Sequence, residues 1–139
     1  MPRRVSEVMT KDPVAIPLET RLPEAARLMR EHGIGNVLVT SGGQLCGLLT
    51  DRDIVIRAVA ERRDLNRTTV GEVCSAEIAT LDPDADAGAA VDLMRARAVR
   101  RIPVVREGLP VGIVSMGDLA IDGDSGSVLA EISKAPPNT

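Results

Sequence analysis

The sequence predicts an α+β fold made of two copies of one βαββα unit, packed about a pseudo-two-fold axis. The chain of 139 residues repeats itself at an offset of 65 positions without a gap. Within each copy, short apolar runs alternate with a segment of helical periodicity. The chain has no Phe, Tyr or Trp, so aliphatic side chains must close the core, and a small aliphatic unit gains stability by pairing with another.

The repeat consists of an ordered series of identical residues. The identical pairs are Val5/Val70, Glu7/Glu72, Val8/Val73, Ala25/Ala90, Leu28/Leu93, Met29/Met94, Arg30/Arg95, Val39/Val104, Gly43/Gly108, Gly47/Gly112 and Asp53/Asp118. Chance would give scattered matches, so we interpret the chain as a tandem duplication. We expect a first repeat at 1–65, a second at 66–125, and a short helix followed by a loose tail at 126–139.

Each copy predicts the order strand, helix, hairpin, helix. In the first copy the elements are a strand at 14–16, a helix from Thr20 to Gly33, strands at 37–39 and 45–49 around the turn 41–43, and a helix from Asp53 to Val59. In the second copy they are a helix at 89–97, strands at 102–105 and 111–114 around Glu107-Gly108, and a short helix after Asp118 that Gly123 and Gly126 break. A further helical turn is expected at 127–134, and the tail at 135–139.

The corner between the last strand and the last helix of each copy carries the same polar pair. Thr50 and Asp53 in the first copy correspond to Ser115 and Asp118 in the second. Free backbone N–H groups and a hydroxyl at such a corner suit a phosphate, and a carboxylate there suits the two hydroxyls of a ribose. The same residues also suit a purely local role as helix caps. Both interpretations remain open from the residues alone.

Two segments around these corners resemble a known family. Gly-Leu-Leu-Thr-Asp-Arg-Asp-Ile at 47–54 and Arg-Arg-Ile-Pro-Val-Val at 100–105 resemble the tandem CBS-domain pair, also called the Bateman module, over about residues 5 to 121. The chain looks most like stand-alone two-repeat proteins of actinobacteria of the hypoxic-response type. The resemblance implies a disc-like homodimer and a cleft between the copies that binds AMP, ADP, ATP or a related adenosyl ligand.

The resemblance also implies roles for individual residues. It implies that Asp53 and Asp118 bind the ribose and that Thr50 and Ser115 contact phosphate. It further implies that two basic residues neutralise phosphate and that four apolar residues form the walls around adenine; these are Arg100 and Arg101, and Ile16, Leu81, Ile102 and Pro103. The first copy departs from this pattern, because Gly35 and Asn36 replace the two arginines and Leu38 replaces the proline. We therefore expect unequal sites, with the tighter one at Asp118. A solvated helix end remains the alternative for the two arginines.

Composition excludes several functional classes. A net charge of −3 and the lack of aromatic residues argue against nucleic-acid binding. No apolar stretch is long enough for a membrane span, and the start of the chain lacks the apolar core of a signal peptide. We therefore expect a cytoplasmic protein that binds neither nucleic acid nor membranes.

Other polar residues resemble sites only superficially. The segment Asp82–Asp86 resembles a calcium loop but lacks its glycine and final glutamate. His32 fits a cation at a helix end better than a general base. Cys46 and Cys74 match no zinc spacing and are expected to be ordinary thiols, with redox sensing as the alternative. We expect no metal site.

The sequence therefore predicts a regulatory sensor of adenine nucleotides with no catalysis. No nucleophile–base set or phosphate-binding glycine loop occurs. No cofactor is required, an adenine nucleotide is the regulatory ligand, and a separate effector protein is a possible recipient of the signal. The alternative is a scaffold or dimerisation module with vestigial pockets, which the altered first site favours.

Overall fold

The computed structural model describes residues 3–123. In chain order the elements are α1 (Val5–Val8), β1 (Thr10–Lys11), β2 (Ala15–Pro17), α2 (Leu22–His32), β3 (Asn36–Ser41), β4 (Gln44–Thr50), α3 (Asp51–Asp53), the π-helix η1 (Ile54–Val59), α4 (Val70–Val73), α5 (Ala87–Arg97), β5 (Arg101–Arg106), β6 (Leu109–Ser115) and α6 (Met116–Gly123). The expected α+β class and its repeated order are confirmed. The helix and tail expected after residue 126 lie outside the described residues.

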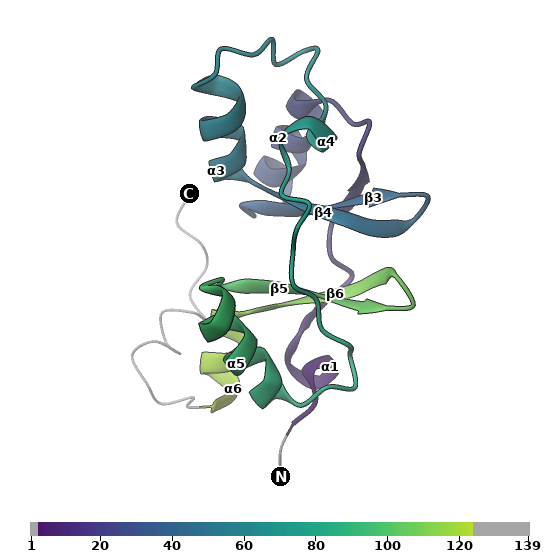
Figure 1. Ribbon diagram of the computed structural model, residues 1–139, viewed down its shortest axis with the longest axis vertical. Coiled ribbons are helices and arrows are strands. Elements are labelled where there is room, and N and C mark those ends of the chain that lie inside the picture. Colours follow the sequence, from purple (N-terminus) through teal and green to yellow (C-terminus); the bar gives the residue numbers. More distant parts are fainter. Residues whose placement is uncertain (1–2, 124–139) are drawn as a thin grey trace. The chain divides into compact units, whose positions relative to one another are not determined.

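Two compact units form, and they do not coincide with the two sequence repeats. The first-repeat unit comprises Val14–Ile78, and the second-repeat unit comprises the described residues 3–13 and 79–123. Each unit therefore contains the helices and hairpin of one repeat together with the leading segment of the other. Within each unit the helices lie on one face of a three-stranded sheet (Figure 1).

The first-repeat unit contains the sheet β2-β3-β4, with β2 parallel to β3 and β3 antiparallel to β4. Helix α2 begins with a proline in its first turn and ends at Gly33, whose φ of 62° is the left-handed conformation that glycine favours. Its apolar stripe, Leu22, Ala25 and Met29, packs on the sheet. Val70 from α4 is fully buried in the same core.

The second-repeat unit repeats this plan with different strand partners. Its sheet has the order β1-β6-β5, and the segment equivalent to β2 forms only a single parallel bridge, between Leu81 and Val104. Ala90 and Met94 of α5 pack against β5 and β6, and Val5 of α1 is fully buried beside them. The segment 3–13 therefore contributes Val5 to this core, with Val8 and Met9 packed against it.

Both hairpins turn through two residues with positive φ. Gly42 and Gly43 have φ of 59° and 84°, and Glu107 and Gly108 have 53° and 83°. This is the turn that matches the twist of paired antiparallel strands. Both predicted hairpins are confirmed.

Candidate functional site: two strand-to-helix corners

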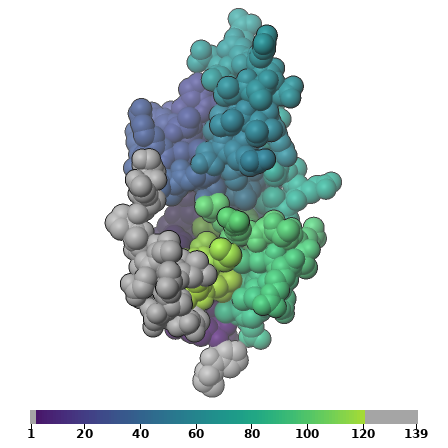
Figure 2. All heavy atoms as spheres, turned by 90° about the vertical axis from the view of Figure 1, so that its left-hand side faces the viewer, coloured from purple at the N-terminus to yellow at the C-terminus, as the bar shows by residue number. Residues whose placement is uncertain are grey.

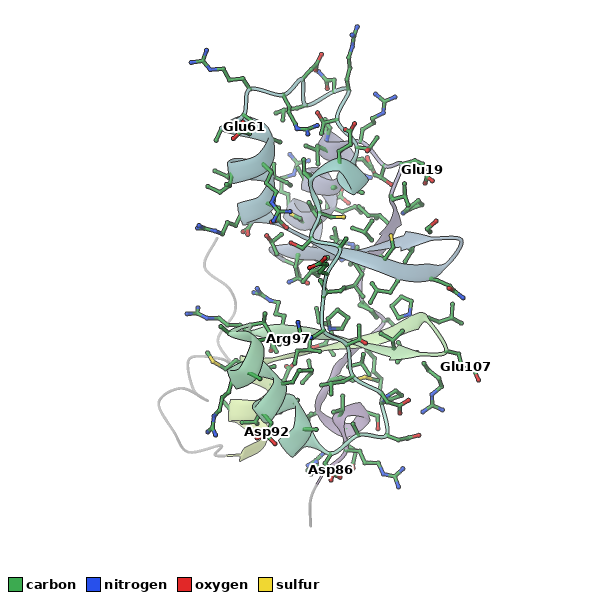
Figure 3. All side chains as sticks on the ribbon, viewed as in Figure 1. Glu19, Glu61, Asp86, Asp92, Arg97 and Glu107 are labelled. Atoms are coloured by element: carbon green, nitrogen blue, oxygen red, sulfur yellow. The ribbon has the colours of Figure 1, made fainter. Side chains whose placement is uncertain are left out.

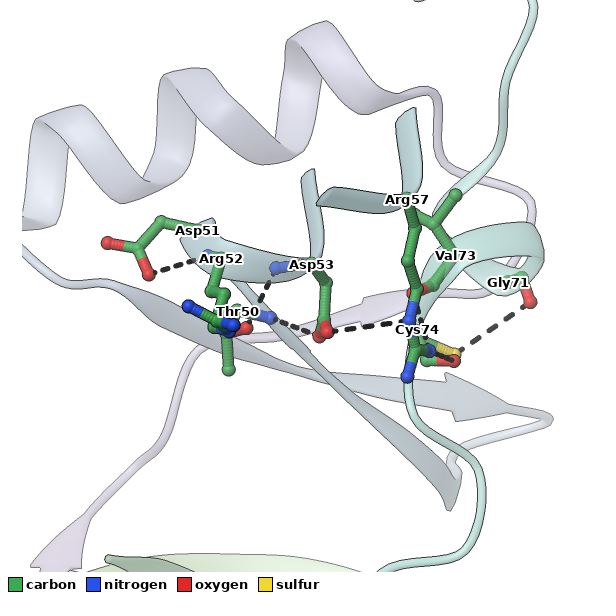
Figure 4. Close-up of polar contacts among 8 residues, drawn as sticks. All are labelled: Thr50, Asp51, Arg52, Asp53, Arg57, Gly71, Val73 and Cys74. Atoms are coloured by element: carbon green, nitrogen blue, oxygen red, sulfur yellow. Dashed lines mark hydrogen bonds and ion pairs between the residues drawn. The ribbon is translucent and has the colours of Figure 1, made fainter. Parts of the chain in front are cut away.

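The first-repeat corner is a closed pair of hydrogen bonds. The backbone N–H of Asp53 donates to Thr50 Oγ1 at 3.1 Å, and the N–H of Thr50 donates to Asp53 Oδ2 at 2.9 Å (Figure 4). This reciprocal arrangement is a capping box, which satisfies two backbone donors at a helix start. The predicted local role of Thr50 and Asp53 is therefore present, and it holds both side chains at the mouth of the corner.

Arg57 adds a cation to this corner. Its Nε lies 3.9 Å from Asp53 Oδ1, and the Asp53 side chain is only 14% exposed. The Arg57 guanidinium also donates to the carbonyl oxygens of Val73 and Cys74, both at 3.2 Å (Figure 4). The second carboxylate oxygen of Asp53 therefore already faces a positive charge, and η1 is tied to the end of α4.

The second-repeat corner has the same core with a different surrounding. The N–H of Asp118 donates to Ser115 Oγ at 3.0 Å, and the N–H of Ser115 donates to Asp118 Oδ2 at 2.9 Å. The position of Arg57 is taken by Asp122 in the second repeat. Within the part of the chain that the structure describes, Asp118 makes no ion pair. Its Oδ1 is therefore the carboxylate oxygen that remains available to a ligand.

Strand pairing places the predicted basic residues beside Ser115. Arg101 is the cross-strand partner of Ser115, and the N–H of Met116 donates to the carbonyl of Arg100 at 2.9 Å. Both arginines are exposed, and neither pairs with an acidic residue among residues 3–123. The structure thus brings Arg100, Arg101, Ser115 and Asp118 together at one corner.

The equivalent positions in the first-repeat unit lack these cations. Asn36 is the cross-strand partner of Thr50, and the N–H of Asp51 donates to the carbonyl of Gly35 at 2.9 Å. Asp51 places a carboxylate where the second repeat has the apolar Met116. The predicted inequality of the two corners therefore has a local electrostatic basis.

The predicted adenine walls lie mostly on the other face of the sheets. Ile16 is in register with Val39, and Leu81 with Val104, both of which face the helices. Ile102 alternates with its neighbours Arg101 and Pro103, and it is fully buried in the helix-side core. Only Pro103 shares a face with Ser115. The role of these residues as walls stays a prediction, and strand alternation is the signal that separates Pro103 from the others.

The glycine of the repeated corner motif has a structural reason that sequence reasoning missed. A Cβ on Gly47 would lie 2.8 Å from Cys74 Sγ and 3.0 Å from the carbonyl oxygen of Ser75. A Cβ on Gly112 would lie 2.9 Å from the carbonyl oxygen of Thr10. In each unit, the leading segment of the other repeat crosses the strand at this glycine.

The two thiols lie beside the first-repeat core. Both cysteines are free and partly buried. Burial is the main cause that raises the pKa of the Cys46 thiol and of the Cys74 thiol. Nearby negatively charged groups raise both pKa values further. Among residues 3–123, no three His, Cys, Asp or Glu side chains lie close enough together to hold a metal ion, and no helix is long and apolar enough to cross a membrane.

Sequence comparison matches both repeats to one family. The model for the CBS domain matches residues 5–59 and 70–121. The CBS domain-containing protein YhcV of Bacillus subtilis is 39% identical over 133 residues, which cover 93% of this chain and 94% of that protein. Hypoxic response protein 1 of Mycobacterium tuberculosis is 41% identical over 100 residues, covering 71% of this chain and 70% of its own length.

Solved structures agree with this match. A crystal structure of Hypoxic Response Protein I with two coordinated zinc ions superposes with a TM-score of 0.78 at 35% identity, covering 86% of this chain and 98% of that one. The CBS domain pair of protein MJ0100, in complex with 5'-methylthioadenosine and S-adenosyl-L-methionine, superposes with a TM-score of 0.80 at 23% identity, covering 91% and 100%. At 23% identity, the similarity to the MJ0100 domain pair shows a shared fold only.

Proposed function

Because the chain belongs to the CBS-domain family and contains two such domains, we propose that it is a regulatory sensor of an adenine nucleotide and has no catalysis of its own. The observation that carries this proposal is the second-repeat corner, where Ser115 and Asp118 lie beside two arginines that have no acidic partner among the described residues. A hydroxyl and two guanidinium groups suit phosphate, and the open oxygen of Asp118 suits a ribose hydroxyl. The MJ0100 domain pair, which shares this fold, binds two adenosyl ligands, and we propose a ligand of the same class here.

The sensing step follows from the position of the corner. Asp118 and Ser115 join the end of β6 to the start of α6, so a ligand held there links a strand to a helix. A ligand changes the conformation of a protein only by the difference in its affinity for two states. We propose that nucleotide stiffens this corner and that a separate effector protein reads the change in a cytoplasmic setting.

Thermal stability tests this proposal directly. AMP, ADP, ATP, NAD and S-adenosylmethionine are each added to the purified protein, and unfolding is followed by circular dichroism because no aromatic fluorophore is present. A ligand at 100 times its Kd adds about 2.7 kcal/mol of apparent stability. Asp118→Asn keeps the acceptor of the capping bond but removes the charge, and we expect it to abolish the largest ligand-induced shift. Asp53→Asn is the matched control and is expected to have a smaller effect.

A scaffold role is the second candidate. Both capping boxes are completed by the protein's own hydrogen bonds, and Asn36 provides no cation at the first corner. Under this alternative the pockets are vestigial and the module serves only in assembly. If none of the five ligands moves the melting temperature, the scaffold interpretation replaces the sensor.

We also propose a homodimer that uses the exposed face of η1. Val55, Ile56 and Val59 are 55%, 47% and 53% exposed. The segment around η1, coloured blue-green, lies at the surface in Figure 2. A hollow of about 550 Å³ borders this apolar patch, and its lining alternates in charge through Arg57, Glu61, Arg63 and Glu72. An apolar patch with a rim of mixed charge suits a second copy of the same surface, as a two-fold interface requires.

Light scattering coupled to size exclusion tests the dimer. Val59→Glu places a charge in the apolar patch, and we expect it to give a monomer. Leu109→Glu is the control, because Leu109 is also 50% exposed but lies in the hairpin of the second-repeat unit. A dimer that survives Val59→Glu places the interface elsewhere.

A further inference from the structure

A third arginine lies close to the second-repeat corner. Helix α5 ends at Arg97, Ala98 adopts the left-handed conformation with φ of 54°, and β5 begins at Arg101. Only three residues therefore separate the end of the helix from the strand that pairs with Ser115. Figure 3 shows Arg97 at this end of α5, beside the start of β5.

Helical geometry directs Arg97 toward the sheet. Ala90 and Met94 are the buried residues of α5, and Arg97 follows Ala90 by seven positions, which returns to the same helix face. Arg95 lies about 200° around the helix axis from Arg97, so its side chain leaves the helix on the solvent side. Arg97 is nevertheless exposed, because the sheet-facing stripe reaches the end of the helix at this residue.

These three arginines have no acidic partner among residues 3–123. Other arginines of the chain do form ion pairs, for example Arg27 with Glu31 and Arg106 with Asp84. Arg97, Arg100 and Arg101 lie within five consecutive positions without an acidic partner among residues 3–123, and this concentration of charge creates a local positive potential in a chain whose net charge is −3. A polyanionic ligand relieves this repulsion, and guanidinium groups bind phosphate through charge-assisted hydrogen bonds.

The first repeat provides an internal comparison. The residues at the positions of the three arginines are His32, Gly35 and Asn36, and Asp51 approaches so closely that a Cβ on Gly35 would lie 2.9 Å from its carboxylate oxygen. Of the other cations there, Arg57 is held by Asp53 and two carbonyl oxygens. Duplication therefore preserved the capping pair in both repeats but left the arginine cluster in the second alone.

From this cluster we infer that the second-repeat corner selects adenine nucleotides by the length of their phosphate chain, binding diphosphates and triphosphates more tightly than the monophosphate. The inference rests on the proposed function, because it assumes that the ribose lies at Asp118. Ser115 and Arg101 are cross-strand partners and suit the first phosphate. Arg100 and Arg97 then supply the cations that only a longer chain reaches.

Isothermal titration calorimetry of the full chain tests the inference without needing an aromatic residue. Adenosine, AMP, ADP, ATP and inorganic tripolyphosphate are titrated in buffer free of divalent cations. We expect ATP to bind at least about tenfold more tightly than AMP, which corresponds to roughly 1.4 kcal/mol. We expect the affinity for ATP to fall more steeply with salt than the affinity for AMP.

Matched variants assign the effect to the cluster. Arg97→Gln should weaken ATP binding roughly fivefold, in the range of an exposed ion pair, and leave AMP binding unchanged. Arg95→Gln removes the same charge from the same helix end but from the opposite face, and we expect less than about a twofold change for either ligand. Arg101→Gln should weaken AMP and ATP alike and leave adenosine unchanged.

The outcomes separate this inference from the proposed function. Equal affinities for AMP and ATP overturn selection by chain length while the sensor stands. Equal effects of Arg95→Gln and Arg97→Gln overturn the assignment to the cluster. Tripolyphosphate that binds as tightly as ATP shows a general polyanion site and overturns selection among nucleotides. Failure of all ligands, adenosine included, overturns the proposed function itself.

Discussion

At the scale of single residues, the capping role of the corner side chains is compatible with the ligand role proposed for them. Thr50 with Asp53, and Ser115 with Asp118, complete hydrogen bonds at the start of a helix. Capping uses one oxygen of each carboxylate and leaves the other. The local role and the ligand role are therefore not alternatives at Asp118, whereas at Asp53 the second oxygen already faces Arg57.

The two corner glycines should be intolerant of a side chain. Gly47→Ala and Gly112→Ala each press a methyl group against the backbone of the crossing segment, and we expect a loss of about 1–3 kcal/mol in the free energy of unfolding. Gly88→Ala is the control, because a Cβ there meets no atom within 4 Å and it lies in α5, so it should stabilise slightly. Urea denaturation followed by circular dichroism measures all three. Equal stability of Gly47→Ala and Gly88→Ala would contradict the close approach.

Thiol chemistry should be slow in the folded protein. Burial raises the pKa of Cys46 and Cys74, so less of each thiol is ionised near pH 8 than in the unfolded chain. A colorimetric thiol reagent should therefore react more slowly without urea than with it. Because the unfolded thiols ionise first, this pair should reduce stability as pH rises above the ordinary thiol pKa of about 8.5. Equal rates with and without urea would show that both thiols are open.

At the scale of elements, η1 is held at a defined place by one side chain. Arg57 connects the corner at Asp53 with the carbonyl oxygens at the end of α4. A π-helical stretch is rare and often marks a functional site, and here it presents the apolar surface that we propose as the dimer interface. The same arginine therefore connects the first corner to that surface.

Removing this connection should weaken the first-repeat unit. Arg57→Ala deletes two bonds to carbonyl oxygens, and we expect a loss of about 1 kcal/mol in the free energy of unfolding. Arg52→Ala is the control, because the Arg52 side chain has no partner among the described residues. Denaturant titration measures the free energy of unfolding of both variants. A loss at Arg52→Ala as large as at Arg57→Ala would show that general charge, and not the specific contacts, matters.

The longer elements could be predicted from the sequence because their signals are local. The apolar stripe from Leu22 to Met29 fixes α2, and glycines fix both hairpin turns. The four-residue helices α1 and α4 could not be predicted, because a single turn has no periodicity and is stabilised by burial of Val5 and Val70 in a distant core. The π-helical form of η1 has no sequence signal either.

At the scale of the whole molecule, the leading segments cross between repeats. Val5 belongs to the leading segment of the first repeat but is buried in the core of the second-repeat unit, and Val70 belongs to the leading segment of the second repeat but is buried in the core of the first-repeat unit. Sequence alignment of the repeats shows that Val5 and Val70 are equivalent, but equivalence does not reveal which core each one enters. The corner motifs, in contrast, could be predicted from the sequence, because Thr50 and Asp53 are close together in the chain and their contact is local.

The crossing predicts where two core substitutions act. Val5→Ala and Val70→Ala should each cost about 2 kcal/mol in the free energy of unfolding. Hydrogen exchange followed by mass spectrometry should show faster exchange at 101–115 for Val5→Ala and at 36–50 for Val70→Ala. The opposite assignment would mean that each leading segment packs on its own repeat.

This crossing also bears on how the duplicated gene arose. A protein made from one repeat alone has no second leading segment to fill its own core. Two such molecules, however, can each lend that segment to the other, so an ancestral half-length chain would have been an obligate pair. Fusion of two such halves would turn a concentration-dependent assembly into a property of one polypeptide.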